Sequence, residues 1–358
     1  MIKMPFRYVY SILIAVMIAV VSSALVSSVS PGTGDLQTRA KQVLGALPKA
    51  MVSEKNPITA EKVRLGKMLF YEPRISVDGT VSCSRCHPFS LYGADGLSRA
   101  VGNLGKVNPR NAPTVLNAAG QVSEHWTGNR ADVEDQAKQS LTGPATFGMP
   151  SYAEAEKRLK GITGYGPLFK RAFPQDKDPI TVDHFAEAVG AFERTLVTPA
   201  PFDVFLTGNP EALSEREKKG LTTFLEVGCS GCHSGPYVGG RRYARFGSSE
   251  PYWKYTKSEK IDEGRFSVTA HESDKYVFKV PVLRNVAKTA PYFHDGSVAD
   301  LEKAEWIMGR IQVGRDLSKE ELESLGAFLK SLTGDIPQDA LQIPLLPSLE
   351  QGLGESER

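Results

Sequence analysis

The sequence shows almost no surplus of charge of either sign. Its 358 residues include 43 Lys and Arg and 41 Asp and Glu, which gives a formal net charge of +2. Lys3 and Arg7 lie in an N-terminal segment that we expect to be removed, and the remaining 41 basic residues then match the 41 acidic ones. Proteins that bind nucleic acid need a surplus of basic residues to neutralise phosphates, so the composition gives no reason to expect a nucleic-acid partner.

Cysteine is scarce, and its placement is regular. The chain has four cysteines, and all fall in two copies of one pattern, Cys83-Ser84-Arg85-Cys86-His87 and Cys229-Ser230-Gly231-Cys232-His233. The pattern Cys-x-x-Cys-His is the attachment signature of c-type haem. Two thiols at this spacing can form thioethers with the two vinyl groups of one porphyrin, and the histidine then binds the iron. One copy alone would also suit buried cysteines or half of a zinc site, but two copies predict two covalently bound haems.

Long runs of alternating apolar and polar residues are also absent, so the chain is not predicted to form extensive β-sheet. Helical patterns recur instead. In each half a helix precedes the haem motif, a long loop-rich stretch follows it, and a further helix closes the unit. We expect helices near residues 59–70, 131–141, 152–159 and 181–197, a helix that begins at the capping box of Ser214, and a last helix that begins at the capping box of Ser318.

This order predicts a mostly α protein that arose by internal duplication, with two cytochrome c-like domains that each surround one covalently bound haem. The predicted boundaries are a signal peptide or N-terminal anchor at 1–30, a linker at 31–56, the first domain at 57–199, the second domain at 200–336, and a C-terminal tail at 337–358.

The N-terminal segment is typical of an exported protein. Lys3 and Arg7 precede an uncharged apolar run from Tyr8 to Val29, and small residues that a signal peptidase could recognise lie within it. The run is also long enough to be an uncleaved transmembrane anchor. Both alternatives place the rest of the chain outside the cytoplasm, in the periplasm.

The function of a haem depends on its sixth ligand. A second strong ligand favours electron transfer, and an open position allows peroxide or oxygen chemistry. Met308 precedes the last predicted helix, where a cytochrome c fold brings a methionine over its haem, although methionine more often fills a gap in a core. The first half has no equally well placed methionine or second histidine. Gln136 could orient a peroxide there, but it could equally be a glutamine on a helix surface.

These motifs together identify a family resemblance. From about Pro57 to Gly334 the chain resembles the bacterial di-haem cytochrome c peroxidases and the wider group that includes the methylamine-utilisation di-haem enzyme. The segments that carry the resemblance, besides the two haem motifs, are Arg110-Asn111-Ala112-Pro113-Thr114, Trp126-Thr127-Gly128-Asn129-Arg130, Val280-Pro281-Val282-Leu283-Arg284-Asn285-Val286 and Thr289-Ala290-Pro291-Tyr292-Phe293-His294-Asp295-Gly296.

The resemblance implies a role for each matching residue. The haem bound by His87 would be the low-potential site where peroxide is reduced, and the haem bound by His233 and Met308 would be the high-potential site that accepts electrons. Trp126 matches the tryptophan between the haems, and Gln136 matches the active-site glutamine. The resemblance also implies a calcium ion at the domain interface, held by Asn111, Thr289 and Pro291, the last two through backbone carbonyls; oxygen ligands suit such a hard cation.

Two positions depart from the family pattern. The active-site glutamate falls on Thr146, and the histidine that many members place over the resting peroxidatic haem falls near Asn103. Without that histidine, the first haem is expected to be open before any reductive activation. Without the glutamate, a proton must come from water or from a shifted carboxylate such as Glu124 or Glu134. General acid–base help is typically worth about 10²–10⁴-fold in rate, so we expect weak peroxidase turnover.

The resemblance thus implies a homodimeric periplasmic enzyme that reduces hydrogen peroxide to water with electrons from a small cytochrome c or cupredoxin. Two alternatives remain open at this point. One is a di-haem oxidase acting on a protein or organic substrate, although the related methylamine-utilisation enzyme has a tyrosine where this chain has Met308. The other is a non-enzymatic electron-transfer protein with two haems.

Overall fold

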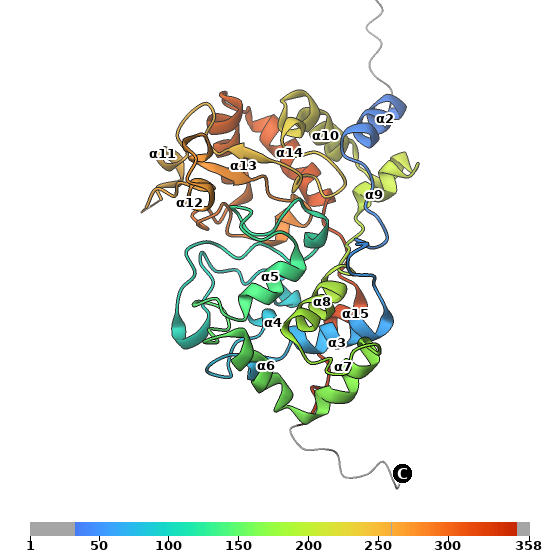
Figure 1. The fold of residues 1–358 in the computed structure, drawn as a ribbon. Coiled ribbons are helices and arrows are strands. Elements are labelled where there is room, and N and C mark those ends of the chain that lie inside the picture. The colour runs from blue at the N-terminus through green and yellow to red at the C-terminus, as the bar shows by residue number, and fades with distance from the viewer. Residues whose placement is uncertain (1–32, 259, 349–358) are drawn as a thin grey trace, which may run out of the picture.

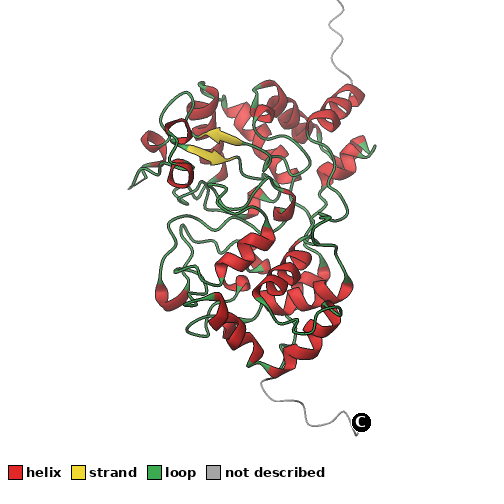
Figure 2. Cartoon of the chain, viewed as in Figure 1, coloured by secondary structure: helices red, strands yellow, loops and turns green. Residues whose placement is uncertain are grey.

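The computed structural model describes residues 33–258 and 260–348, so the predicted signal peptide or anchor at 1–30 lies outside the described residues. The mostly α fold predicted from the sequence is confirmed (Figure 2). The strands in the described part, β1 (Tyr243–Arg245) and β2 (Val277–Lys279), form one antiparallel pair. Within the described ranges no helix is both long and apolar enough to span a membrane.

Two lobes follow one another along the chain (Figure 1). We call residues 60–196 the first half and residues 201–332 the second half. The first half contains α3 (Ala60–Phe70), α4 (Cys83–Cys86), α5 (Val133–Ser140), α6 (Tyr152–Lys160), α7 (Gly166–Ala172) and α8 (Val182–Glu193). The second half contains α9 (Pro201–Leu206), α10 (Glu215–Glu226), α11 (Trp253–Thr256), α12 (Phe266–Thr269), α13 (Leu301–Met308) and α14 (Lys319–Ser331). Two helices flank the halves, α2 (Thr33–Val43) and α15 (Gln338–Leu341).

The predicted helix starts are confirmed. The hydroxyls of Thr59 and Thr181 accept hydrogen bonds from the third backbone N–H after them, and Ser214 and Ser318 form capping boxes with Glu217 and Glu321. These side chains satisfy N–H groups that have no partner within the helix. The predicted end of the helix at 181–197 was too late: α8 ends at Glu193, because the chain then turns into the junction between the halves.

The same close helix crossing occurs in both halves. Helix α3 crosses α8, and α10 crosses α14. A Cβ placed on Gly66 would lie 1.8 Å from the carbonyl oxygen of Ala188, and one on Gly220 would lie 1.8 Å from that of Ser324. Only glycine permits such an approach of two backbones. The repetition of this contact at matching places supports an internal duplication.

The two halves meet at equivalent buried asparagines. Asn117 and Asn285 both adopt the left-handed conformation, with φ of 59° and 63°. Their backbone N–H groups donate to the carbonyls of Leu196 and Leu332 respectively, at 2.8 and 3.1 Å. Both side-chain amides donate to the hydroxyl oxygen of Thr198, at 2.8 and 2.9 Å. The Thr198 hydroxyl therefore joins corresponding points of the two halves.

The N-terminal end of the described chain packs on the second half. Leu36, Ala40 and Leu44 enter the core that contains Phe202 and Phe205. The prediction of a linker over residues 31–56 therefore needs correction, because residues 33–43 form a packed helix. The spacing of the three apolar residues, four apart each time, carried that signal.

The C-terminal end packs on the first half. Ile336 and Ala340 join the core of the first half, and the Lys67 ammonium pairs with the Asp339 carboxylate at 2.9 Å. Arg74 donates to the carbonyl of Pro347 at 2.9 Å. The predicted tail at 337–358 is thus, over residues 337–348, part of the first half's surface and core. The N-terminal segment therefore completes the core of the second half, and the C-terminal segment completes the core of the first half.

The helix crossing gives a stability prediction. Gly66→Ala and Gly220→Ala should each lower the free energy of unfolding by about 1–3 kcal/mol, because the added methyl group meets a backbone carbonyl that can move only with its helix. Gly231→Ala is the matched control, since a Cβ there meets nothing within 4 Å. Chemical unfolding of the three variants measures this. Equal stability of Gly66→Ala and Gly231→Ala would contradict the close crossing.

Candidate functional site

The second haem motif forms a short turn at the wall of a cavity. Residues Cys229–Gly231 make one 3₁₀ turn, and the N–H of His233 donates to the carbonyl of Cys229 at 2.9 Å. The Nδ1 of His233 lies 3.2 Å from the carbonyl oxygen of Pro281. A carbonyl can only accept, so Nδ1 carries the proton and Nε2 is left with a free lone pair. Burial lowers the pKa of His233 to about 4, which keeps the ring neutral and able to bind a metal.

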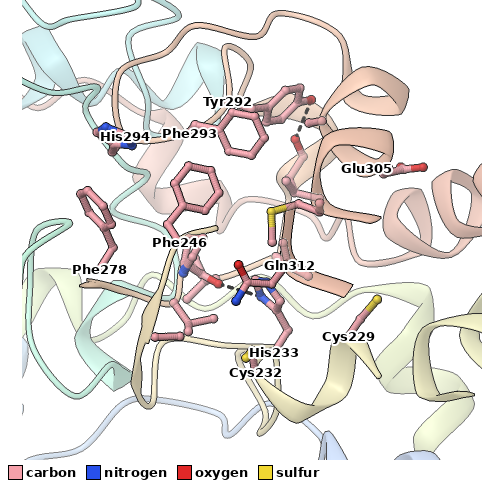
Figure 3. A pocket seen from close by; sticks show the side chains of 18 of the residues that line it. Cys229, Cys232, His233, Phe246, Phe278, Tyr292, Phe293, His294, Glu305 and Gln312 are labelled. Carbon is pink, nitrogen blue, oxygen red and sulfur yellow. Dashed lines mark hydrogen bonds between the residues drawn. The ribbon is translucent and has the colours of Figure 1, made fainter. Parts of the chain in front are cut away.

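This cavity has a volume of about 620 Å³. Cys229, Cys232, His233 and Met308 all contribute to its wall. Figure 3 shows His233 and Cys232 at its lower wall and the rings of Phe246 and Phe293 above. The rest of the lining is mostly apolar and includes Phe224, Val227, Phe278, Val280, Val282, Leu283, Val286, Leu301, Leu317, Leu325 and Leu329. Two thiols, one imidazole and one thioether around an apolar space of this size are a donor set that fits a c-type haem.

One carboxyl in the cavity wall has no partner. Glu305 of α13 is buried, and neither of its oxygens has a hydrogen-bond partner among the described residues. A Cβ placed on Gly326 of α14 would lie 3.4 Å from its Oε1, so the missing side chain at Gly326 makes room for the carboxyl. Burial raises the pKa of Glu305 to about 8, with the neighbouring Glu302 adding to the effect. The sequence reasoning missed this residue, since a glutamate on an amphipathic helix is usually exposed.

The first haem motif repeats the orientation of its histidine. Cys83–Cys86 form α4, and the N–H of His87 donates to the carbonyl of Cys83 at 3.0 Å. Its Nδ1 lies 3.0 Å from the carbonyl oxygen of Gly93, so this ring also keeps Nε2 free. Burial raises the pKa of Cys83, and the Glu193 carboxylate adds to that shift. Burial raises the pKa of Cys86 to about 11.

Two loops near the first site are locked together. The amide of Asn103 donates to the carbonyls of Pro144 and Thr146, both at 2.8 Å. The hydroxyl of Thr146 faces the carbonyls of Ser140 and Gly143, at 2.5 and 3.0 Å. Both side chains therefore use their donors inside the loops, and neither is free to donate a proton to a ligand.

Gln136 differs from these two residues. It lies half-buried on α5, and its side-chain amide makes no hydrogen bond within the ranges that the structure describes. Its role toward peroxide at the first site stays a prediction.

The two shifted carboxylates considered above are engaged elsewhere. Glu134 receives two hydrogen bonds from the Arg194 guanidinium, at 2.8 and 2.7 Å, and one from Asn56. Burial raises its pKa, but these hydrogen bonds outweigh burial and leave the pKa below its usual range. Glu124 is buried 3.6 Å from the ammonium of Lys279. Burial raises the pKa of Glu124 to about 7 and lowers that of Lys279.

Trp126 and the three residues of the predicted calcium site line the same cavity as His233. The indole N–H of Trp126 donates to the carbonyl of Asn111 at 3.0 Å. The amide nitrogen of Asn111 donates to Leu97, which leaves its side-chain oxygen without a hydrogen-bond partner among the described residues. The carbonyls of Thr289 and Pro291 likewise accept no hydrogen bond there. The three residues thus line one cavity, and calcium binding by them stays a prediction.

Glu305 gives a pH prediction. Its pKa of about 8 in the folded protein lies above its ordinary value of 4.5, so between these values the folded state holds a proton that the unfolded state releases. Stability from this group is therefore fully present below about pH 4.5 and is lost as the pH rises through 8. Glu305→Gln should be more stable than the unchanged protein by about 1–3 kcal/mol at pH 9, because no carboxylate is then buried without a partner.

The measurement is urea unfolding of the haem-loaded protein at pH 6 and pH 9. Glu211→Gln, an exposed position that does not line the cavity, is the control and should leave the pH dependence unchanged. An equal loss of stability with pH in Glu305→Gln and the unchanged protein would contradict the assignment.

Comparison with known proteins identifies the family of this chain. A family model described as di-haem cytochrome c peroxidase matches residues 60–211. The chain is 41% identical over 297 residues to cytochrome c551 peroxidase of Pseudomonas aeruginosa, covering 82% of this chain and 84% of that protein. It is 39% identical over 323 residues to cytochrome c551 peroxidase of Nitrosomonas europaea, covering 90% and 94%. A solved MauG-like protein associated with microbial copper homeostasis has a TM-score of 0.74 at 30% identity, covering 83% of this chain and 97% of that one. The chain therefore belongs to the di-haem cytochrome c peroxidase family.

Proposed function

We propose that this protein reduces hydrogen peroxide to water, with electrons delivered by a small periplasmic cytochrome c or cupredoxin. The observation that carries the proposal is the difference between two otherwise repeated sites. Met308 lines the cavity of the second site together with His233. At the first site, Asn103, which stands near the family's histidine position, is bound into a loop. One site is thus equipped with two ligands and suits electron transfer, and the other is left with one and suits peroxide binding.

When bound through Cys83, Cys86, Cys229 and Cys232, two c-type haems would supply the one-electron chemistry at the two sites. The chain's own residues then have distinct tasks. The carbonyls of Gly93 and Pro281 hold the two histidine rings in the tautomer that presents Nε2. The thioether of Met308 favours the reduced state of the second site.

Reduction of one peroxide needs two electrons and two protons and yields two waters. Gln136 is neutral, so its free amide can orient the peroxide but cannot take its proton. Thr146 holds its hydroxyl against two backbone carbonyls and cannot replace a carboxylic acid. The protons therefore come from water, and turnover is slower than in an enzyme with a positioned acid.

Two further proposals concern the cellular location of the protein and a calcium ion between its halves. We place the protein in the periplasm because covalent haem attachment and the N-terminal segment both suit export. The free oxygens of Asn111, Thr289 and Pro291 would hold calcium where the two halves meet. A calcium ion there would fix Asn111, whose backbone carbonyl accepts the hydrogen bond from the Trp126 indole, together with the backbone at Thr289 and Pro291.

A steady-state assay with hydrogen peroxide and a reduced small cytochrome c tests the function. The protein should consume peroxide faster than free haem, and Gln136→Leu should lower kcat by about 10²-fold, the usual result of losing one positioned donor. Gln139→Leu on the same helix is the control, since its amide is bound to Asp135. Turnover no faster than free haem, with two haems per chain on a haem stain, would overturn the proposed function.

Met308 gives a separate prediction. Met308→Leu should lower the midpoint potential of the second haem by more than about 60 mV, which corresponds to a tenfold loss of preference for the reduced iron. Met68→Leu in the first half is the control and should leave that potential unchanged. Spectroelectrochemical titration measures both. In the half-reduced protein, only the haem that stays ferric gives an electron spin resonance signal. A low-spin, six-coordinate signal from that haem would indicate an electron-transfer protein without peroxidase activity.

A further inference from the structure

Lys279 is a buried cation in an unusual setting. It ends strand β2 of the second half, opposite Tyr243 of β1, and its side chain is 5% exposed. It also contributes to the wall of the cavity that contains His233 and Met308. Burial of an ammonium is unfavourable unless it is paired and hydrogen-bonded, so a residue of this kind calls for a physical reason.

The partners of Lys279 all lie in one short segment of the other half. Its backbone N–H donates to the carbonyl of Trp126 at 2.8 Å. Its ammonium donates to the side-chain oxygen of Gln121 at 2.6 Å and to the carbonyl of Ser123 at 2.8 Å. The carboxylate of Glu124 balances its charge from 3.6 Å. Lys279 thus contacts four positions between residues 121 and 126, the segment that leads into Trp126.

This segment has few other constraints on the side of the second half. Val122 donates to the carbonyl of Gly240, and the hydroxyls of Ser123 and Tyr243 lie 2.6 Å apart. His125, next to Trp126, is held in the left-handed conformation with a φ of 65°. Backbone in that conformation persists only where its surroundings fix it. Within the first half, the Nδ1 of His125 lies 2.9 Å from the side-chain oxygen of Asn129, and the N–H of Glu124 donates to the carbonyl of Arg130. The contacts of Lys279 on both sides of His125 add to these from the second half.

We propose that Lys279, with its counter-charge Glu124, is the positioning residue for electron transfer between the two haem sites, because it holds the segment that carries Trp126 against the cavity of the second site. This inference rests on the proposed two-haem function, because that function is what places Trp126 between the two haems. In each transfer one electron leaves the second site and arrives at the first, and no bond or proton changes. A displacement of about 1 Å in a positioned group can cost about 10²-fold in rate, so a clamp on this segment has kinetic consequences.

The experiment uses the haem-loaded protein without peroxide. One electron is delivered by flash photoreduction, and its equilibration between the two haems is followed by absorbance. Lys279→Met should slow equilibration at least about tenfold and speed hydrogen–deuterium exchange of the peptide covering residues 121–130. Lys279→Arg keeps a cation with several donors and should retain most of the rate. Lys303→Met, whose ammonium lies over the ring of Trp306 in its own half, is the control.

The midpoint potential of the second haem is a second readout. If Lys279 and Glu124 had a purely structural role, their two charge variants would not shift this potential in opposite directions. Lys279→Met removes a positive charge from the cavity wall and should lower the potential of the second haem. Glu124→Gln removes the balancing negative charge and should raise it. If Lys279→Met does not fold, Gln121→Leu removes one of the ammonium's acceptors and should slow equilibration several-fold.

Three outcomes would overturn the proposal: a normal equilibration rate in Lys279→Met or, where that variant fails to fold, in Gln121→Leu; unchanged exchange in residues 121–130; or potentials that shift in the same direction in both charge variants. Loss of peroxidase activity does not enter any of these measurements. A failure of the proposed function and a failure of this proposal therefore give different results.

Discussion

In each half of this protein, a backbone carbonyl accepts a hydrogen bond from the Nδ1–H of the haem-motif histidine and so fixes the orientation of its ring. The rest of each site depends on this contact. His87 donates to Gly93 and His233 donates to Pro281. Since burial lowers the pKa of both rings and keeps them neutral, only Nε2 remains to bind a metal. The carbonyls come from loops, which must hold their shape without the regular bonds of a helix or sheet. This requirement explains why long irregular segments follow both haem motifs.

The duplication preserves backbone contacts and varies side chains. The crossings at Gly66 and Gly220, and the two asparagines that meet at Thr198, repeat from one half to the other. By contrast, Met308 lines the cavity of the second site, whereas in the first half Asn103 ties two loops together. A common frame thus carries two sites that differ in their side chains. The N-terminal segment packs on the second half and the C-terminal segment on the first, which ties the halves together.

Much of this could be predicted from the sequence, for identifiable reasons. Helix starts at Thr59, Thr181, Ser214 and Ser318 were predictable because capping is local and needs only residues three apart. The haem motifs were readable because their spacing is fixed by the porphyrin. The packing of α2 on the second half and of residues 336–348 on the first could not be read, since it joins residues more than 150 positions apart. The pairing of Glu124 with Lys279 was hidden for the same reason, and Glu134 meets Arg194 and Asn56 from 60 and 78 positions away.

The paired buried charges differ in how the partners meet. Arg194 with Glu134, and Arg284 with Asp203, are bidentate pairs in which each guanidinium meets both oxygens of its partner. Pairs of this kind satisfy each other and fix the elements that carry them. Lys279 is different, because its closest contacts are an amide and a backbone carbonyl, and Glu124 stays 3.6 Å away. An ammonium placed for an ion pair alone would lie closer to its carboxylate. This one is directed at the backbone of a single segment, so its charge serves to hold the chain next to Trp126 in place.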